Sequence, residues 1–213
     1  KIVRIGIVGT GRIAPRFISE SKYVSGLTIE CAYNPVDESA KRFEKREKIK
    51  CYTGDYEEFL GNVDAVYIAS PNETHFEYAK KAIEAGKHVL SEKPLSFTKK
   101  ESEELYTSAK EKNVVLMEAV KAAYCPGFQQ LINVAKSGKI GDIVDVEASF
   151  TRLADPLSRE RTDAEYGGAF LEFGPSVLVP VIKLMGKDYT SVTFDSIYDD
   201  NGVDLYTKAD IRY

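Results

Sequence analysis

The chain has 213 residues, of which 43% are hydrophobic and 29% charged, and these proportions are ordinary for a globular protein. Basic and acidic side chains are scattered along it and give a net charge of −4, which argues against a nucleic-acid-binding surface. No apolar run approaches the roughly 20 residues of a membrane span, so no membrane partner is expected.

The cysteine and histidine content limits the redox and metal chemistry. Three cysteines, Cys31, Cys51 and Cys125, are odd in number and share no short spacing, so they predict neither a disulfide framework nor a zinc site. Two histidines, His75 and His88, are too few for a His-based metal centre. We therefore expect no metal and a reducing, cytoplasmic setting, with no signal peptide before the first strand.

Residues 1–120 alternate apolar strands with amphipathic helices. Strands are predicted at 1–8, 28–33, 64–70, 87–92 and 113–120, and helices from about 12 and at 37–48, 74–86 and 98–112. We expect Asp37 to cap one helix, Gly86 to follow another in the C′ position, and Thr98 with Glu101 to form a capping box. This alternation predicts right-handed βαβ units and a doubly wound parallel sheet, whose ligands bind beyond the carboxyl ends of the strands.

The pattern changes after about residue 122. We predict a helix at 126–138, a half-exposed strand at 142–152, a charged loop at 155–165 and an apolar segment at 167–186. Residues 190–198 and 203–213 alternate as strands around a turn at 199–202, which indicates an antiparallel hairpin. Two α/β domains are therefore expected, 1–121 and 122–213, and the second is expected to be incomplete because the chain stops inside an apparent strand.

Gly9-Thr10-Gly11-Arg12-Ile13-Ala14 joins the first strand to the first helix. This G-x-G-x-x-A pattern is typical of dinucleotide-binding turns, in which the first glycine bends the chain and the second lets the backbone approach a pyrophosphate. The helix N-terminus supplies N–H groups and partial positive charge to the phosphates. The candidate cofactor-binding residues are therefore Gly9, Gly11, Arg12 and Ile13. The alternative is a glycine turn used only for packing.

The end of the second strand bears on the choice between NAD and NADP, because an acidic residue there usually holds the ribose hydroxyls of NAD. The run here is Ala32-Tyr33-Asn34-Pro35. Asn34 can bond a ribose hydroxyl but has no charge to repel a 2′-phosphate, and no arginine follows it. Glu30 lies earlier in the strand, where a solvent-facing or helix-paired role is favoured. The predicted cofactor is therefore NAD or NADP.

Glu92-Lys93-Pro94 ends an apolar strand with two charges and with a residue that has no N–H for a sheet. Taken alone, the triplet is interpreted as a solvated turn. Its place at the carboxyl end of a strand, where ligands of a parallel sheet bind, favours a functional role for Lys93 instead.

These motifs carry a resemblance to a known family. The glucose-fructose oxidoreductase/inositol dehydrogenase (Gfo/Idh/MocA) family has segments of the same order and spacing as 9–14, 69–75, 85–89 and 92–94. Segments 116–119 and 137–141 look similar to its dihydrodiol dehydrogenase-like branch, and the resemblance covers residues 1 to about 186. It implies an N-terminal Rossmann domain and a C-terminal α+β domain with an open, mainly antiparallel sheet. It also implies NAD(P)-linked oxidation or reduction of a sugar, polyol or related alcohol, and a homo-oligomer (dimer or tetramer).

By this resemblance Lys93 is the main acid/base at the substrate hydroxyl, and Glu92 and Pro94 fix the strand end that aims it. A cis bond before Pro94 is compatible with this setting. Glu92 also lies among the residues that border the cofactor. The resemblance places beside the same cofactor a loop that contains Ser70, Asn72 and His75. Asn72 could equally be a helix cap.

The second domain departs from the family pattern. Relatives carry an Asp and, four residues later, a His on one helical face, and the matching positions here are Glu172 and Ser176. These two are the catalytic candidates of this domain. Glu172 can bond a substrate hydroxyl or hold Lys93, whereas a serine cannot accept and return a proton near neutral pH as a histidine does.

The sequence leaves two interpretations of Lys121 open and favours a packing role for two tyrosines. Lys121 falls in a region that lines the substrate pocket in relatives, where it either binds a carboxylate or phosphate or is solvated. Tyr124 and Tyr166 are interpreted as packing residues.

Two functions compete. The first is an NAD(P)-dependent oxidoreductase that acts on a small-molecule alcohol or carbonyl substrate, and the intact Glu92-Lys93-Pro94 favours it. The alternative is a dinucleotide-binding family member without turnover, acting as a ligand-responsive regulatory or binding protein, which Ser176 keeps open.

Overall fold

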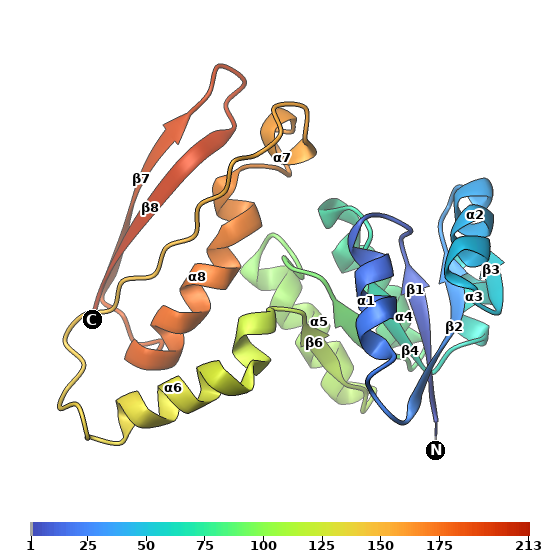
Figure 1. The fold of residues 1–213 in the computed structure, drawn as a ribbon, viewed down its shortest axis with the longest axis horizontal. Coiled ribbons are helices and arrows are strands. Elements are labelled where there is room, and N and C mark those ends of the chain that lie inside the picture. The colour runs from blue at the N-terminus through green and yellow to red at the C-terminus, as the bar shows by residue number, and fades with distance from the viewer. Residues whose placement is uncertain (1) are drawn as a thin grey trace. The chain divides into compact units, whose positions relative to one another are not determined.

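The computed structural model describes residues 2–213, so Lys1, with which the first expected strand begins, lies outside the described residues. The chain folds as two compact units, 1–119 and 120–213, and each is described by itself. Figure 1 shows the order of their elements along the chain. None of the helices in residues 2–213 combines the length and the apolar character that crossing a membrane requires.

The first unit alternates strands and helices. Its elements are β1 (Val3–Val8), α1 (Ile13–Ser21), β2 (Leu27–Tyr33), α2 (Asp37–Glu47), β3 (Cys51–Thr53), α3 (Tyr56–Gly61), β4 (Ala65–Ile68), η1 (Asn72–Thr74), α4 (His75–Glu84), β5 (His88–Ser91), α5 (Lys99–Glu111) and β6 (Leu116–Glu118). The six strands pair in parallel in the order β3-β2-β1-β4-β5-β6. The predicted doubly wound parallel sheet is confirmed, and its strand order reverses between β1 and β4, where such sheets bind ligands.

Both faces of this sheet are covered, which explains why its strands are mostly apolar. Ile7 and Val8 are neighbours on β1 that point to opposite faces, and both are fully buried. Ile7 packs with α1 and α2 through Ala14 and Phe43, whereas Val8 belongs to the cluster formed with α3, α4 and α5. The sheet edge that carries the loops is therefore supported by a core on each side.

Two of the three predictions for helix ends are confirmed. Thr98 and Glu101 form the expected capping box at α5, and Gly86 follows α4 with a φ of 72° in the C′ position. The expectation that Asp37 caps α2 is wrong, because Val36 occupies the N-cap and Asp37 is the first helical residue. The carboxylate there acts on the helix dipole instead of capping.

Residues 49–62 hold two elements that the sequence did not indicate. β3 has only three residues and α3 only six, too few for a hydrophobic period to be recognised. β3 also brings Cys51 opposite Cys31 on β2, and the two form a disulfide. The expectation that the cysteines form no disulfide is therefore wrong, because an intervening helix separates residues that are neighbours across parallel strands.

The second unit contains η2 (Lys121–Tyr124), α6 (Pro126–Lys136), α7 (Arg159–Thr162), α8 (Ala169–Met185), β7 (Ser191–Tyr198) and β8 (Asp204–Arg212). β7 and β8 pair antiparallel, so the predicted hairpin is confirmed. Its inner face contacts α8, where the rings of Phe170 and Phe194 meet edge to face with centroids 5.5 Å apart.

The strand predicted at 142–152 is absent from the described structure, where this segment has no regular secondary structure and is mostly exposed. Alternating side chains are only half of what a strand needs, because its N–H and C=O groups must also pair with a neighbouring strand. Among residues 2–213, β7 and β8 pair with each other and not with this segment.

Candidate functional site

The glycine turn after β1 is locked into the sheet. Gly9 has a φ of 93°, and a Cβ there would lie 2.7 Å from both the Ala69 oxygen and the Ser70 nitrogen. Its own N–H donates to the Tyr33 carbonyl at 2.9 Å. Only glycine fits this position, so the end of β1 stays in contact with the ends of β2 and β4.

The other side of the turn is open. A Cβ added to Gly11 would meet no protein atom within 4 Å. α1 begins at Ile13, with Arg12 as its N-cap, and the cap makes no side-chain hydrogen bond to the helix. The first turn of α1 also has no acidic residue. The first N–H groups of a helix have no acceptor within the helix, and together with the positive end of the helix dipole they fit a phosphate group at this position.

Asn34 joins the end of β2 to the glycine turn. Its Nδ2 donates to Thr10 Oγ1 at 2.8 Å, and its Oδ1 accepts the Val36 N–H at 2.9 Å. The amide thereby fixes the backbone of both segments while presenting no charge. Each of its polar atoms has capacity for a second hydrogen bond.

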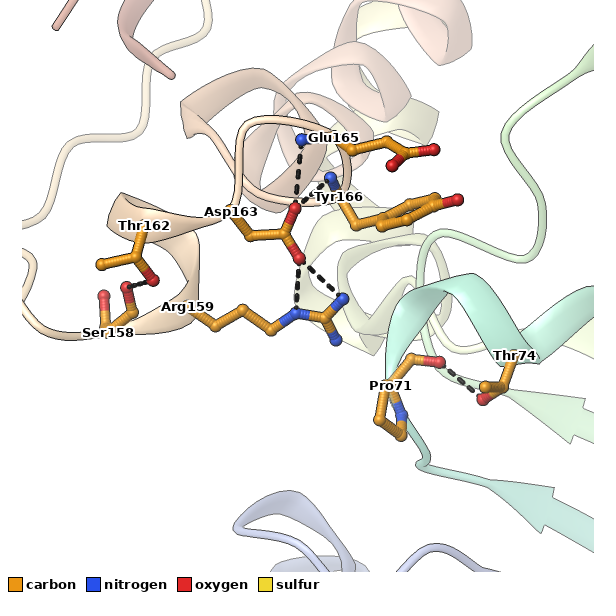
Figure 2. A network of polar contacts seen from close by, with 8 residues as sticks. All are labelled: Pro71, Thr74, Ser158, Arg159, Thr162, Asp163, Glu165 and Tyr166. Carbon is orange, nitrogen blue, oxygen red and sulfur yellow. Dashed lines mark hydrogen bonds and ion pairs between the residues drawn. The ribbon is translucent and has the colours of Figure 1, made fainter. Parts of the chain in front are cut away.

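The loop after β4 contains Ser70, Asn72 and His75. The Thr74 hydroxyl donates to the Pro71 carbonyl at 2.7 Å and lies 2.7 Å from Ser70 Oγ, and Figure 2 shows the first of these contacts. Asn72 is half-buried and begins η1, and neither η1 nor α4 has a side-chain cap. The helix-cap interpretation of Asn72 is therefore wrong.

His75 is 1% exposed, and its ring lies between two loops. Nδ1 is 2.8 Å from the Pro94 carbonyl oxygen, and Nε2 is 2.9 Å from the Ser70 carbonyl oxygen. Both ring nitrogens thus face main-chain acceptors of the protein. The histidine connects the loop after β4 with the loop after β5.

Lys93 lies in the loop after β5, half-buried, and a cis peptide bond joins it to Pro94. On its N-terminal side, the Glu92 N–H donates to the Ile68 carbonyl at 2.8 Å, and Glu92 Oε1 accepts the Tyr67 hydroxyl at 2.5 Å. On its C-terminal side, the Leu95 N–H donates to Glu118 Oε1 at 2.8 Å. The backbone around Lys93 is therefore fixed from both sides.

Tyr67 is suited to hold Glu92. Its side chain is 2% exposed and stacks on Phe17, with ring centroids 3.8 Å apart. Burial, and then the hydrogen bond to Glu92, raise the pKa of the phenol well above its ordinary value. The Tyr67 hydroxyl consequently stays protonated at neutral pH and donates to Glu92.

Glu172 and Ser176 both lie on α8, four residues apart and half-buried, so they share one face of that helix. The N-terminus of α8 is closed by the protein itself. Asp204, the first residue of β8, accepts the Phe170 N–H at 2.8 Å, and a Cβ on Gly168 would overlap its Oδ1. This contact fixes the turn of helix that carries Glu172.

The loop before α8 is organised by Asp163. Its carboxylate accepts the N–H groups of Glu165 and Tyr166 at 3.0 and 2.9 Å and two N–H groups of the Arg159 guanidinium at 3.0 and 2.9 Å, contacts that can be followed in Figure 2. The Tyr166 N–H first, and then Arg159, lower the pKa of this carboxyl. The loop conformation therefore depends on an ionised Asp163.

Lys121 begins η2 and is exposed, and Tyr124 at the end of the same turn is 54% exposed, which does not fit the packing role expected for it. Tyr166 is half-buried. Within residues 2–213, no three His, Cys, Asp or Glu side chains are grouped so that they could hold a metal ion.

The structure brings the glycine turn, Asn34, the 70–75 loop and Lys93 to one edge of the parallel sheet, while Lys121, Glu172 and Ser176 belong to the second unit. Sequence reasoning missed four residues that hold these groups in place. They are Tyr67, Glu118, Asp163 and Asp204. Only Glu118 carried a usable signal, as a carboxylate that ends an apolar strand at the ligand-binding edge.

Comparison with known proteins gives a consistent result. Residues 3–120 match the family described as "Oxidoreductase family, NAD-binding Rossmann fold". The scyllo-inositol 2-dehydrogenase (NADP(+)) IolU of Bacillus subtilis is 31% identical in an alignment 195 positions long, which covers 87% of this chain and 59% of that protein. The trans-1,2-dihydrobenzene-1,2-diol dehydrogenase of Xenopus laevis is 29% identical in an alignment 214 positions long, which covers 98% of this chain and 64% of that protein.

A solved structure extends the similarity to the fold. KijD10, a 3-ketoreductase from Actinomadura kijaniata in complex with NADP and TDP-benzene, superposes with a TM-score of 0.86 at 29% identity. The alignment covers 98% of this chain and 66% of KijD10, and the chain spans about three fifths of the length of the two relatives above. Since the family match covers more than half of the residues, the chain belongs to this NAD-binding oxidoreductase family, the Gfo/Idh/MocA family that its motifs resemble.

Proposed function

We propose that the protein is an NAD(P)-dependent oxidoreductase that transfers a hydride between the nicotinamide and a sugar, polyol or related alcohol or carbonyl compound. The observation that carries the proposal is the fixed backbone on both sides of Lys93, at the same sheet edge as the open glycine turn. The three relatives act on substrates of this kind by their names, and two of those names include NADP.

The cofactor would rest on the glycine turn. In this proposal Gly9 and Gly11 let the main chain approach the pyrophosphate, and the first turn of α1, from Arg12 and Ile13, binds its charge. Asn34 bonds the ribose with the hydrogen-bonding capacity that Thr10 and Val36 leave, and binds either NAD or NADP. Further along the edge lie Ser70, Asn72 and Glu92. The bound nicotinamide supplies the hydride chemistry.

Lys93 is the main acid/base of the proposal. Its amine exchanges a proton with the substrate hydroxyl or carbonyl oxygen, which general acid–base catalysis requires at the reacting atom. Glu172 accepts a hydrogen bond from a substrate hydroxyl. Ser176 hydrogen-bonds the substrate through its own hydroxyl but does not accept and return a proton. Lys121 binds a negatively charged substituent where the substrate has one.

The remaining parts of the proposal concern the setting of the protein. We assign it a cytoplasmic location, a small-molecule substrate and a dimeric or tetrameric assembly of identical chains, as the family resemblance implies. Light scattering coupled to size-exclusion chromatography measures the assembly, and a monomer at micromolar concentration contradicts that part alone.

A titration followed by a substrate panel tests the function. NADH and NADPH are titrated by their fluorescence, and sugars, polyols, diols and their ketones are then screened at the absorbance of the reduced nicotinamide. Binding with turnover supports the oxidoreductase, whereas binding without turnover on any substrate supports the regulatory alternative that Ser176 suggests. The absence of binding at millimolar cofactor contradicts both.

Lys93→Ala tests the assigned role on a substrate found in this way. We expect kcat to fall by roughly 10²–10⁴-fold, the size of a general acid–base contribution, while the cofactor Kd changes little. Lys100→Ala is the matched control, because Lys100 is an exposed lysine in the first turn of α5. Wild-type kcat in Lys93→Ala would show that another group moves the proton.

A further inference from the structure

We propose that His75 and Glu118 are positioning residues for Lys93, which fix the two residues that follow it and contact neither the cofactor nor the substrate. The inference rests on the proposed function, since it concerns the geometry of the catalytic lysine. It gives His75 a different task from the cofactor contact that the family resemblance implies. It also assigns a role to the carboxylate of Glu118, to which the resemblance gives none.

The backbone after Lys93 offers few groups by which it can be held. Pro94 has no N–H, so its carbonyl and the N–H of Leu95 are the first polar atoms available. Each is bonded by a side chain from a different element: His75 Nδ1, from the start of α4, lies 2.8 Å from the Pro94 oxygen, and Glu118 Oε1, from β6, lies 2.8 Å from the Leu95 nitrogen. Pro94 and Leu95 are both buried.

The chemistry of each side chain matches the atom it meets. The Leu95 N–H can only donate, and a carboxylate accepts from it with a charge-assisted bond. The carbonyls of Ser70 and Pro94 can only accept, and the two nitrogens of one imidazole ring lie within hydrogen-bond distance of both. A neutral ring donates its single N–H to one of the two carbonyls, and the tautomer decides which one. A phenyl ring fills the same space without an N–H, and an amide presents all its N–H groups from a single atom.

The burial of His75 argues for support and against contact with a ligand. The side chain is 1% exposed, and both of its ring nitrogens are engaged by main-chain oxygens of the protein. Together with the Tyr67–Glu92 hydrogen bond on the other side, these contacts leave the Lys93 segment attached at Glu92, Pro94 and Leu95. A displaced catalytic group loses about 10²-fold in rate for an error of roughly 1 Å.

Three variants of the whole protein test the inference, with His88→Asn as the control. His88 is exposed at the start of β5, at the opposite edge of the sheet, and its Nδ1 accepts the Val115 N–H. His75→Phe and Glu118→Leu remove the contacts. Glu118→Gln keeps an acceptor oxygen for Leu95.

The first readout separates chemistry from binding. We expect kcat to fall by about tenfold to a hundredfold in His75→Phe and Glu118→Leu, while the cofactor Kd stays within about twofold. Glu118→Gln should retain most of the kcat, and the isotope effect with deuterated reduced nicotinamide should rise in the two damaging variants. If the cofactor Kd weakens in proportion to the loss of kcat/KM in His75→Phe, the histidine is a cofactor contact and the inference is wrong.

The second readout is independent of turnover. Lysines are reductively methylated with ¹³C-formaldehyde and a borohydride-type reductant, and the NMR signal of Lys93 is assigned by its loss in Lys93→Ala. We expect this signal to move or broaden in Glu118→Leu and in His75→Phe, and to be unchanged in Glu118→Gln and His88→Asn. An unchanged Lys93 signal in Glu118→Leu overturns the inference even if the protein proves to be an enzyme, and if His75→Phe does not fold, the two Glu118 variants decide.

Discussion

Glycines at positive φ precede two helices of this protein, α1 and α8, but the surroundings of the two helix N-termini differ. α1 follows Gly9 at 93°, and the space beside Gly11 holds no protein atom within 4 Å. α8 follows Gly168 at 96°, but there Asp204 fills the space and accepts the Phe170 N–H. The N–H groups at the start of α1 have no side-chain cap and fit an anionic ligand, whereas at the start of α8 the Phe170 N–H helps to hold the fold.

The difference lies in what a distant part of the chain places beside the glycine. Asp204 comes from β8, 34 residues beyond Phe170, and it also accepts the Thr207 hydroxyl at 2.9 Å. No carboxylate caps α1, and its first turn contains none. A glycine pair before a helix thus indicates that another group comes close to the main chain there. Only the tertiary structure shows whether this group is a ligand or a side chain.

The largest effect is expected for Gly168→Ala. The added Cβ overlaps Asp204 Oδ1, and the left-handed φ strains any side chain, so we expect about 2–4 kcal/mol of destabilisation. Urea unfolding of the two proteins measures it. A loss below about 0.5 kcal/mol would mean that α8 can begin without Asp204.

Gly11→Ala is the matched change at the other helix. No protein atom opposes its Cβ, so we expect the free energy of unfolding to change by less than about 1 kcal/mol while NAD(P)H affinity falls about tenfold or more. Fluorescence titration and urea unfolding of one preparation separate the two quantities. Unchanged affinity would exclude the open side of the turn as the pyrophosphate site.

Asp204→Ala removes the cap of α8 without adding a clash. We expect a loss of about 1–2 kcal/mol, the usual value of a helix N-cap, with a smaller loss in Asp204→Asn because the amide oxygen still accepts from Phe170. Comparison of the two variants by thermal unfolding isolates the hydrogen bond. Equal losses in both would assign the effect to charge.

The smallest effect concerns the pH dependence of the loop before α8. The pKa of Asp163 is lowered in the folded protein, so its contribution to stability is complete above the ordinary carboxyl pKa of about 3.9 and is lost as the pH falls through the lower folded value. The difference in Tm between the parent and Asp163→Asn should therefore shrink below about pH 4. A difference that is constant down to pH 2.5 contradicts this origin.

Local patterns were sufficient for five of the six strands of the first unit, because the signals of these strands and of the helices between them each lie within one segment. The turn at Gly9–Ala14, the capping box of Thr98 and Glu101, and the alternation of apolar strands with helices need no knowledge of distant residues. The Glu92-Lys93-Pro94 triplet gained its meaning from the parallel sheet, since the sheet order places it at the ligand-binding edge.

Three of the missed contacts join residues that are far apart in the sequence, whereas Asp163 binds partners within four residues of itself. Glu118 meets Leu95 across 23 residues, His75 meets Pro94 across 19, and Asp204 meets Phe170 across 34. The wrong strand at 142–152 has the same cause, because side-chain alternation says nothing about whether a neighbouring strand is present to accept its N–H groups.

The Cys31–Cys51 disulfide closes a ring of chain with a sequence separation of 20 residues. The ring contains Asn34, the Val36 N–H that Asn34 binds, and all of α2. It ends on the three-residue edge strand β3. Closing a loop of this size in the unfolded chain removes conformational entropy worth about 3 kcal/mol in the chain-entropy description. The segment that would hold the ribose is thus part of a covalent ring. Its end on β3 remains attached to β2 even when the hydrogen bonds of β3 open.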